Sequence, residues 1–125
     1  MSPATSSREV VVSELQLTAR FSIHEGKLEE FKSLARQCME VVRTKDSGTL
    51  QYDWFFNADG TECVVRERYR DSGAVLEHAA NLGDLIGRFM AISNPDFEIY
   101  GAPTDALLSA IAALQPRVFS AYQSI

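Results

Sequence analysis

The spacing of hydrophobic residues divides the first half of the chain into four elements. Residues 15–23 alternate hydrophobic and polar side chains, which predicts a half-buried strand. In residues 28–42 the hydrophobic positions recur at three- and four-residue steps, which predicts an amphipathic helix that ends at the polar segment 46–48. Alternation returns in 50–57 and 61–70 around an Asp-Gly turn, so these two segments are predicted to form a hairpin.

The second half of the sequence predicts a helix, a strand and another helix. A helix is expected to begin after Asp71 and Ser72, which are good N-cap residues. It is kinked or split at Gly83 and Asp84, and it ends at Pro95. A last strand is expected at about 97–102. A short helix at 106–114 follows, and a C-terminal extension completes the chain.

The order strand, helix, strand, strand, helix, strand indicates an α+β, ferredoxin-like βαββαβ fold with an extra C-terminal helix. We therefore expect a four-stranded antiparallel sheet with helices on one face. The expected divisions are a flexible N-terminal arm at 1–13, the ferredoxin-like domain at 14–102, and the C-terminal helix and extension at 103–125.

Three consecutive aromatic residues suggest that the uncovered face of the sheet binds a second copy of the chain. Trp54, Phe55 and Phe56 would supply large apolar groups to both faces of their strand. An apolar sheet face without helices needs a partner, and a second sheet is the simplest one. The sequence thus predicts a homodimer that associates through its sheet faces.

Composition and charge narrow the class of partner. The chain has 125 residues, is 46% hydrophobic and carries a formal net charge of -5, which fits one folded domain without a basic footprint for nucleic acid. Arg66, Arg68 and Arg70 share one strand face, which is either salt-bridged to its neighbours or a local anion site. No nucleic-acid partner is expected.

The remaining sequence signals give no membrane segment, secretory signal or metal motif. No run is long and apolar enough to span a bilayer, and the first residues lack the basic-then-apolar order of a signal peptide. Cys38 and Cys63 fall on hydrophobic positions without metal-ligand spacing, so they are expected to be core thiols. A cytoplasmic protein without a bound metal is expected.

Three segments together resemble a known family. They are Gly26 to Phe31, Ser47 to Tyr52, and Glu67 to Asp71 followed by Leu76, Glu77 and His78. In this order and spacing they resemble the antibiotic biosynthesis monooxygenase family of dimeric α/β barrels, over residues 14–102. The resemblance implies the fold, whereas the activity must be argued from individual residues, because relatives oxygenate quinols or anthrones without cofactor, degrade haem or isomerise small molecules.

The resemblance points to Tyr69 and His78 as candidate catalytic residues. Relatives that are oxygenases usually have Trp at the position of Tyr69, beside the substrate; a tyrosine there can still stack on a planar ring and donate a hydrogen bond. His78 borders the hydrophobic stripe of its helix and could take a proton from a quinol or anthrone near neutral pH, or ligate haem iron. The alternatives are a core tyrosine and a structural histidine.

Four further residues are candidates for substrate binding. Trp54 and Phe89 could form flat walls of an apolar pocket, or simply belong to the core. Glu67 shares a strand face with Tyr69 and could be a buried carboxylate paired with Arg20, in a structural or a catalytic role.

The leading hypothesis is a cofactor-free monooxygenase that acts on a small, apolar, planar quinol or polyketide-like compound with dioxygen. One alternative is a haem-binding or haem-degrading protein, although the absence of Trp at position 69 counts against it. The other is a non-catalytic, dimeric ligand-binding barrel in which the C-terminal extension packs over the partner.

Overall fold

The computed structural model describes residues 13–125, which form one sheet with helices packed against it. The expected arm at 1–13 lies, except for Ser13, outside the described residues. The elements before the middle of the chain are β1 (Leu15–Ile23), α2 (Leu28–Lys45), β2 (Thr49–Phe56) and β3 (Glu62–Tyr69). They are followed by α3 (Ser72–Leu82), α4 (Asp84–Ile92), β4 (Ser93–Tyr100), α5 (Asp105–Ala110), the 3-10 helix η1 (Ala112–Leu114) and β5 (Arg117–Phe119).

The predicted α+β, ferredoxin-like order is present, but the sheet is larger than expected. Its strand order is β2-β3-β1-β4-β5, in which the first four strands are antiparallel. The fifth strand lies parallel to β4, with Ile99 opposite Val118. The expectation of a four-stranded antiparallel sheet is therefore wrong in this detail, because part of the C-terminal extension joins the edge and makes the sheet mixed.

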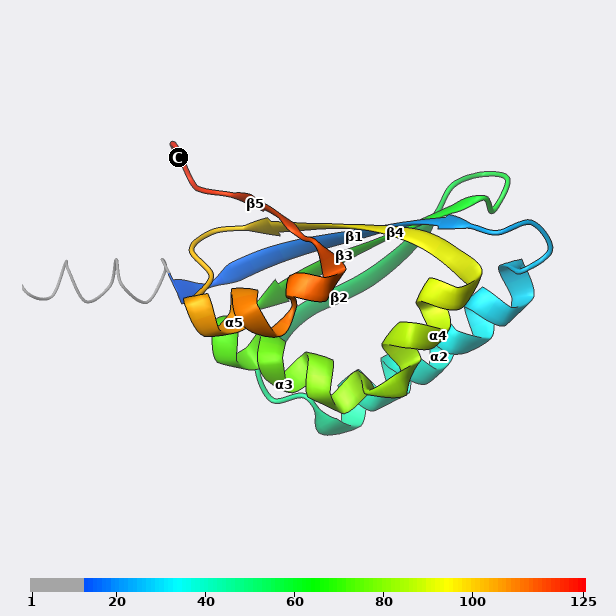
Figure 1. The fold of residues 1–125 in the computed structure, drawn as a ribbon, viewed down its shortest axis with the longest axis horizontal. Helices are drawn as coiled ribbons and strands as arrows, with labels where there is room; N and C mark the ends of the chain where they lie inside the picture. Colours follow the sequence, from blue (N-terminus) through cyan, green and yellow to red (C-terminus); the bar gives the residue numbers. More distant parts are fainter. Residues whose placement is uncertain (1–12) are drawn as a thin grey trace, which may run out of the picture.

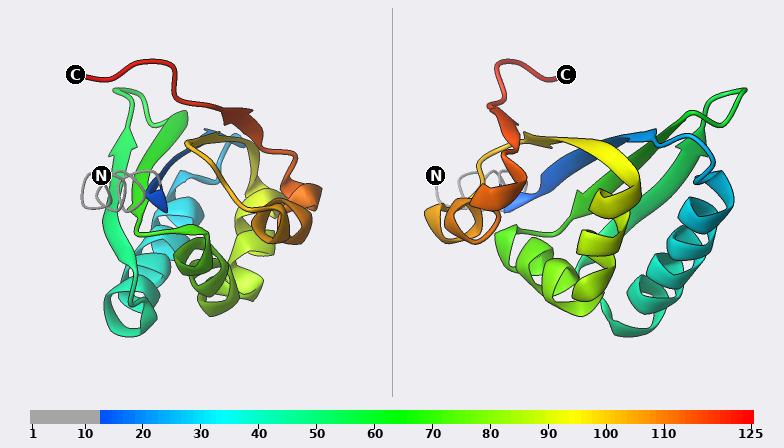
Figure 2. Two further views of the ribbon diagram at one scale, coloured as in Figure 1. Left: turned by 90° about the vertical axis from the view of Figure 1, so that its left-hand side faces the viewer. Right: turned by 45° about the vertical axis from the view of Figure 1, so that its right-hand side comes forward.

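Within residues 13–125, the four α-helices lie on one face of the sheet, as Figure 1 shows. The Asp71 carboxylate accepts a hydrogen bond from the Ala74 N–H and begins α3 as the sequence predicts. Gly83, at a φ of 52°, separates α3 from α4, so the predicted split is confirmed. Figure 2 shows the two helices side by side with α2 beneath the sheet.

The strand β4 begins earlier than the sequence suggests. We expected a strand from about residue 97, because Pro95 ends helices, but the strand runs from Ser93 and pairs Pro95 with Phe21 of β1. The pairing of β4 with β5 begins only at Glu98. Pro95 is tolerated because β4 has no partner strand on its outer side at this residue, so the N–H that proline lacks is not needed for pairing.

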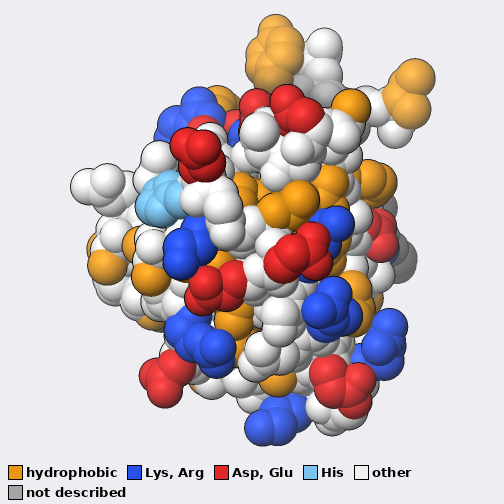
Figure 3. All heavy atoms as spheres, turned by 90° about the vertical axis from the view of Figure 1, so that its right-hand side faces the viewer, with side chains coloured by type: hydrophobic (Ala, Val, Ile, Leu, Met, Phe, Trp, Pro, Cys, Tyr) orange, Lys and Arg blue, Asp and Glu red, His pale blue; other side chains and the backbone are white. Residues whose placement is uncertain are grey.

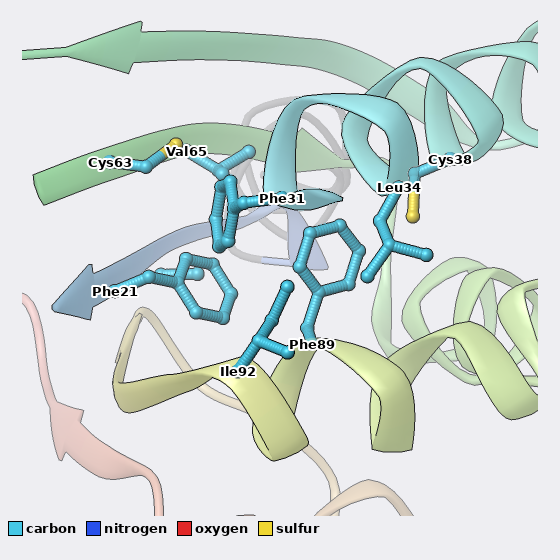
Figure 4. Packing of buried hydrophobic residues seen from close by; sticks show 9 residues of the cluster. Phe21, Phe31, Leu34, Cys38, Cys63, Val65, Phe89 and Ile92 are labelled. Atoms are coloured by element: carbon cyan, nitrogen blue, oxygen red, sulfur yellow. The ribbon is translucent and has the colours of Figure 1, made fainter. Parts of the chain in front are cut away.

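The core lies between the sheet and the helices in two clusters. Figure 4 shows the larger one, in which Phe31 of α2 contacts Phe21 of β1 and Phe89 of α4, with ring centroids 5.4 and 5.0 Å apart. Cys38 and Cys63 are buried there as free thiols, in agreement with the prediction. The smaller cluster includes Leu107 of α5, which is fully buried. The C-terminal helix is therefore part of the core.

No α-helix covers the other face of the sheet in the described part of the chain (Figure 1). Three aromatic residues are prominent among the large hydrophobic side chains exposed in the structure: Phe55, and the stacked pair Tyr100 and Phe119, whose ring centroids are 5.2 Å apart. Within residues 13–125, no helix is long and apolar enough to cross a membrane.

Candidate functional site

A short segment between α2 and β2 is held against α3 at three consecutive residues. Asp46 accepts hydrogen bonds from α3, the Ser47 N–H donates to Glu77 at 3.0 Å, and Gly48 packs against Ala74. A Cβ atom on Gly48 would lie only 2.5 Å from the Ala74 Cβ, so this approach requires glycine. The segment that ends α2 thereby brings a carboxylate to the side of α3 that faces the sheet.

The Asp46 carboxylate holds the ring of His78. Its Oδ2 lies 2.8 Å from His78 Nδ1 and accepts the Thr49 hydroxyl at 2.7 Å, while Oδ1 accepts the Asn81 amide at 2.8 Å. Burial alone would raise the pKa of Asp46, but the hydrogen bonds from Asn81, Thr49 and His78 outweigh it and lower the pKa. An ionised Asp46 favours the tautomer of His78 with the proton on Nδ1, which leaves Nε2 free to act as a base.

The other ring nitrogen faces a second buried carboxyl group. His78 Nε2 lies 4.0 Å from Glu67 Oε1, and the Tyr69 hydroxyl donates a hydrogen bond of 2.5 Å to the same oxygen. Burial raises the pKa of Glu67, and the opposing effects of His78 and Tyr69 do not cancel it. Glu67 therefore keeps its proton to a higher pH than an exposed glutamate does. The neighbouring group, His78 Nε2, is suited to accept a proton.

Aromatic rings fix the plane of the imidazole. The ring centroids of Tyr52 and Tyr69 lie 5.1 and 5.2 Å from that of His78. The Tyr52 hydroxyl is itself hydrogen-bonded to the Cys38 thiol. Burial raises the pKa of both tyrosines and raises that of Cys38 to about 12, so these three groups stay neutral around the site.

His78 and Glu67 open onto an apolar cavity between the sheet and the helices. The cavity has a volume of about 100 Å³, and its walls include Trp54, Phe89, Leu17, Leu82 and Phe97. Apolar cavities of about 150 Å³ bind benzene, so this cavity has room for about one aromatic ring, and the rest of a larger planar ligand would lie outside it. A planar ligand with an ionisable group would place that group at the His78 end.

The structure brings five of the six predicted site residues together and separates the sixth. Tyr69, His78 and Glu67 form the polar cluster, and Trp54 and Phe89 line the cavity. Arg20 instead has a half-exposed side chain and pairs with Glu98, at 3.6 Å. The expected pairing of Glu67 with Arg20 is therefore wrong. Ala19 and Phe21 of β1 face the helices, so the side chain of Arg20 between them points to the other face of the sheet.

Sequence reasoning missed two members of the site. The sequence predicts Asp46 only as part of the polar segment that ends a helix, and nothing local to it indicates a contact with His78, 32 residues away. Tyr52 lies on the same strand face as Trp54, and this alternation could have identified it as a cavity residue. The register of β2 shifts between Thr49 and Gln51, and Leu50 is exposed although the alternation in residues 50–57 predicts that it shares the buried face.

Within residues 13–125, no group of three or more His, Cys, Asp and Glu side chains is arranged to hold a metal ion.

The arginines on the outer face are partly neutralised by acids: Arg68 pairs with Glu14 at 3.7 Å and Arg70 with Asp71 at 3.8 Å. Figure 3 shows Lys and Arg mixed with Asp and Glu on another side of the molecule, so no basic patch forms on that face.

Comparisons with solved structures find the same architecture in bacterial proteins. MupZ from Pseudomonas fluorescens is 26% identical, with a TM-score of 0.79 over 90% of this chain and 88% of that chain. Rv0793 from Mycobacterium tuberculosis is 25% identical, with a TM-score of 0.64 over 74% of this chain and 97% of that chain.

A third structure shares the fold at lower identity. SnoaB, a cofactor-independent oxygenase from Streptomyces nogalater, is 18% identical, with a TM-score of 0.63 over 74% of this chain and 95% of that chain. No curated protein matches the sequence. The family model described as antibiotic biosynthesis monooxygenase matches residues 15–83, which is more than half of the chain and includes Asp46, Glu67, Tyr69 and His78. The chain therefore belongs to the antibiotic biosynthesis monooxygenase family.

Proposed function

We propose that this protein is a cofactor-independent monooxygenase that uses dioxygen on a small planar quinol or an enolisable aryl ketone. The observation that carries the proposal is the Asp46–His78 pair, 2.8 Å apart, at the polar end of an otherwise apolar cavity. A base oriented by a carboxylate in an apolar site suits proton removal from a weakly acidic organic substrate.

Proton removal is the step that this site would promote. His78 Nε2 takes the proton, and the Asp46 carboxylate stabilises the resulting imidazolium. The electron-rich substrate anion transfers one electron to dioxygen, and the substrate radical and superoxide then combine to form a carbon–oxygen bond. At a methylene carbon the peroxide loses water, so CH₂ becomes C=O and the second oxygen atom leaves as water. Glu67, beside His78, is placed to return a proton to the departing oxygen.

Oxygen uptake by metal-free protein tests the proposal. We expect 1,4-naphthoquinol or anthrone to be consumed faster than the autoxidation background, with one O₂ per substrate oxidised. His78→Ala should abolish the enzymatic rate, whereas His24→Ala, a change in an exposed histidine, should leave it intact. A rate that is unchanged in His78→Ala would exclude His78 as the base.

Haem binding is less compatible with this cavity. The chain has Tyr69 at the position where haem-degrading relatives are expected to have Trp. Nε2 is the ring nitrogen left to ligate iron, and it lies 4.0 Å from Glu67 Oε1, so ligation would require this buried carboxyl group to move. A Soret shift on addition of haemin, lost in His78→Ala, would reverse this preference. A ligand-binding protein without turnover would instead bind the quinol with no oxygen uptake.

We also propose that the chain forms a cytoplasmic homodimer through the outer face of the sheet. The exposed Phe55, Tyr100 and Phe119 support the interface, and the two free, buried thiols fit a reducing compartment. Sedimentation should give a dimer that Phe55→Glu dissociates and Gln37→Glu, on exposed α2 surface, does not. A monomeric wild-type protein would refute the interface.

A further inference from the structure

The indole N–H of Trp54 is a buried donor without an acceptor in the described part of the chain. Among residues 13–125, Trp54 Nε1 has no hydrogen-bond acceptor and no contact with solvent. The rings around the indole belong to Phe31, Tyr52 and Phe89, whose centroids lie 6.3, 5.6 and 5.6 Å from that of Trp54. A buried donor without an acceptor destabilises the fold, and a phenylalanine of similar shape would avoid this cost.

The position of Trp54 in the cavity indicates where an acceptor would come from. Trp54 and His78 line the same cavity, and the ring of Tyr52 contacts both, with centroids 5.6 Å from Trp54 and 5.1 Å from His78. The Tyr52 ring thus contacts both the indole that carries the unused donor and the imidazole of the proposed base. A ligand that reaches from Trp54 to His78 would place a different functional group beside each of them.

We propose that Trp54 Nε1–H donates a hydrogen bond to a carbonyl oxygen of the substrate, across the ring from the hydroxyl that His78 deprotonates. The inference rests on the proposed function and specifies its substrate class as hydroxyaryl carbonyl compounds. In such a compound, loss of the hydroxyl proton moves negative charge through the ring onto the carbonyl oxygen. A donor fixed at that oxygen in an apolar cavity therefore stabilises the anion more than the neutral substrate.

The probe that matches this arrangement is 4-hydroxyacetophenone, and 4-ethylphenol is its counterpart without the carbonyl. Trp54→Phe removes the N–H and retains a ring, whereas Phe97→Leu alters another partly buried wall residue without removing a donor. Binding would be measured by calorimetry without oxygen. We expect Trp54→Phe to weaken 4-hydroxyacetophenone by about 10-fold to 100-fold, the range for a hydrogen bond to a charged group, and 4-ethylphenol by less than threefold.

The control variant and the wild-type protein determine whether this effect belongs to the hydrogen bond. Phe97→Leu should change the affinity of both ligands by the same factor. The inference is overturned if Trp54→Phe weakens both ligands equally, or if 4-hydroxyacetophenone does not bind the wild-type protein. In the first case Trp54 contributes only shape to the cavity.

A second readout observes the indole directly, because Trp54 is the single tryptophan of the chain. Its ¹⁵N–¹H signal should move downfield with 4-hydroxyacetophenone and not with 4-ethylphenol; equal shifts would overturn the inference. These binding experiments are independent of turnover. If Trp54→Phe selectively weakens 4-hydroxyacetophenone but the protein takes up no oxygen, only the proposed oxygenase activity is refuted. If the protein takes up oxygen equally well as Trp54→Phe and the variant weakens both ligands equally, only the role of Trp54 is refuted.

Discussion

Asp46 Oδ2 and His78 Nδ1 lie 2.8 Å apart, although 32 residues separate them in the sequence. The side chain of Asp46 is 1% exposed and that of His78 is 9% exposed, so the pair is shielded from water. Shielding strengthens the electrostatic coupling between a carboxylate and an imidazolium. The pair is therefore the part of the structure that most directly supports acid–base chemistry.

Asp46→Asn should lower kcat strongly with little change in the affinity for substrate. The amide removes the negative charge that stabilises the imidazolium and no longer favours the Nδ1–H tautomer, so we expect a loss on the order of 10² to 10⁴. Oxygen uptake under saturating quinol measures kcat. The matched control is Asp53→Asn on the exposed part of β2, which should retain the wild-type rate.

Acid should remove the stability that ionised Asp46 provides. The hydrogen bonds to Asp46 lower its pKa in the folded state below the ordinary value of 3.8, so its contribution is complete above that value and disappears as the pH falls through the folded pKa. The free energies of unfolding of wild type and Asp46→Asn, measured in urea, should therefore differ at pH 6 and converge as the pH falls below 3.8. A constant difference over this range would contradict the prediction.

Glu67 should have the opposite dependence on pH. Burial raises its pKa above 4.5, so folding becomes less favourable as the pH rises from 4.5 toward the folded pKa, where the buried group must ionise. Glu67→Gln keeps an acceptor for the Tyr69 hydroxyl and cannot ionise. Its stability relative to wild type should increase between pH 5 and pH 8 in urea titrations, whereas Glu62→Gln at the exposed start of β3 should show no such trend.

Gly48→Ala should destabilise the fold and reduce activity together. The new Cβ would meet the Ala74 Cβ at 2.5 Å and push the 46–48 segment from α3, at a cost of about 1–3 kcal/mol. Gly87→Ala provides the control, because nothing lies within 4 Å of a Cβ there and alanine favours a helix by roughly 0.5–1 kcal/mol. Thermal unfolding should give a lower Tm for the first and an equal or higher Tm for the second.

Local patterns were sufficient for most of the fold. Alternation in β1 and the three- and four-residue spacing in α2 each bury one side of a regular element, and this requirement is visible in the order of residues. The cap at Asp71 and the break at Gly83 also follow from single-residue preferences. The same alternation puts Arg20 and Glu67 on opposite faces of the sheet, so their separation also follows from the order of residues.

Only the tertiary structure determined how the sheet ends and which carboxylate holds His78. The three residues of β5 are too short for a pattern and become a strand because the edge of β4 offers backbone partners. Asp46 reaches His78 because Gly48 lets the chain approach α3, a contact between segments that are distant in sequence. Sequence periodicity records which side of an element is buried, whereas the pairing of particular side chains depends on how the elements pack.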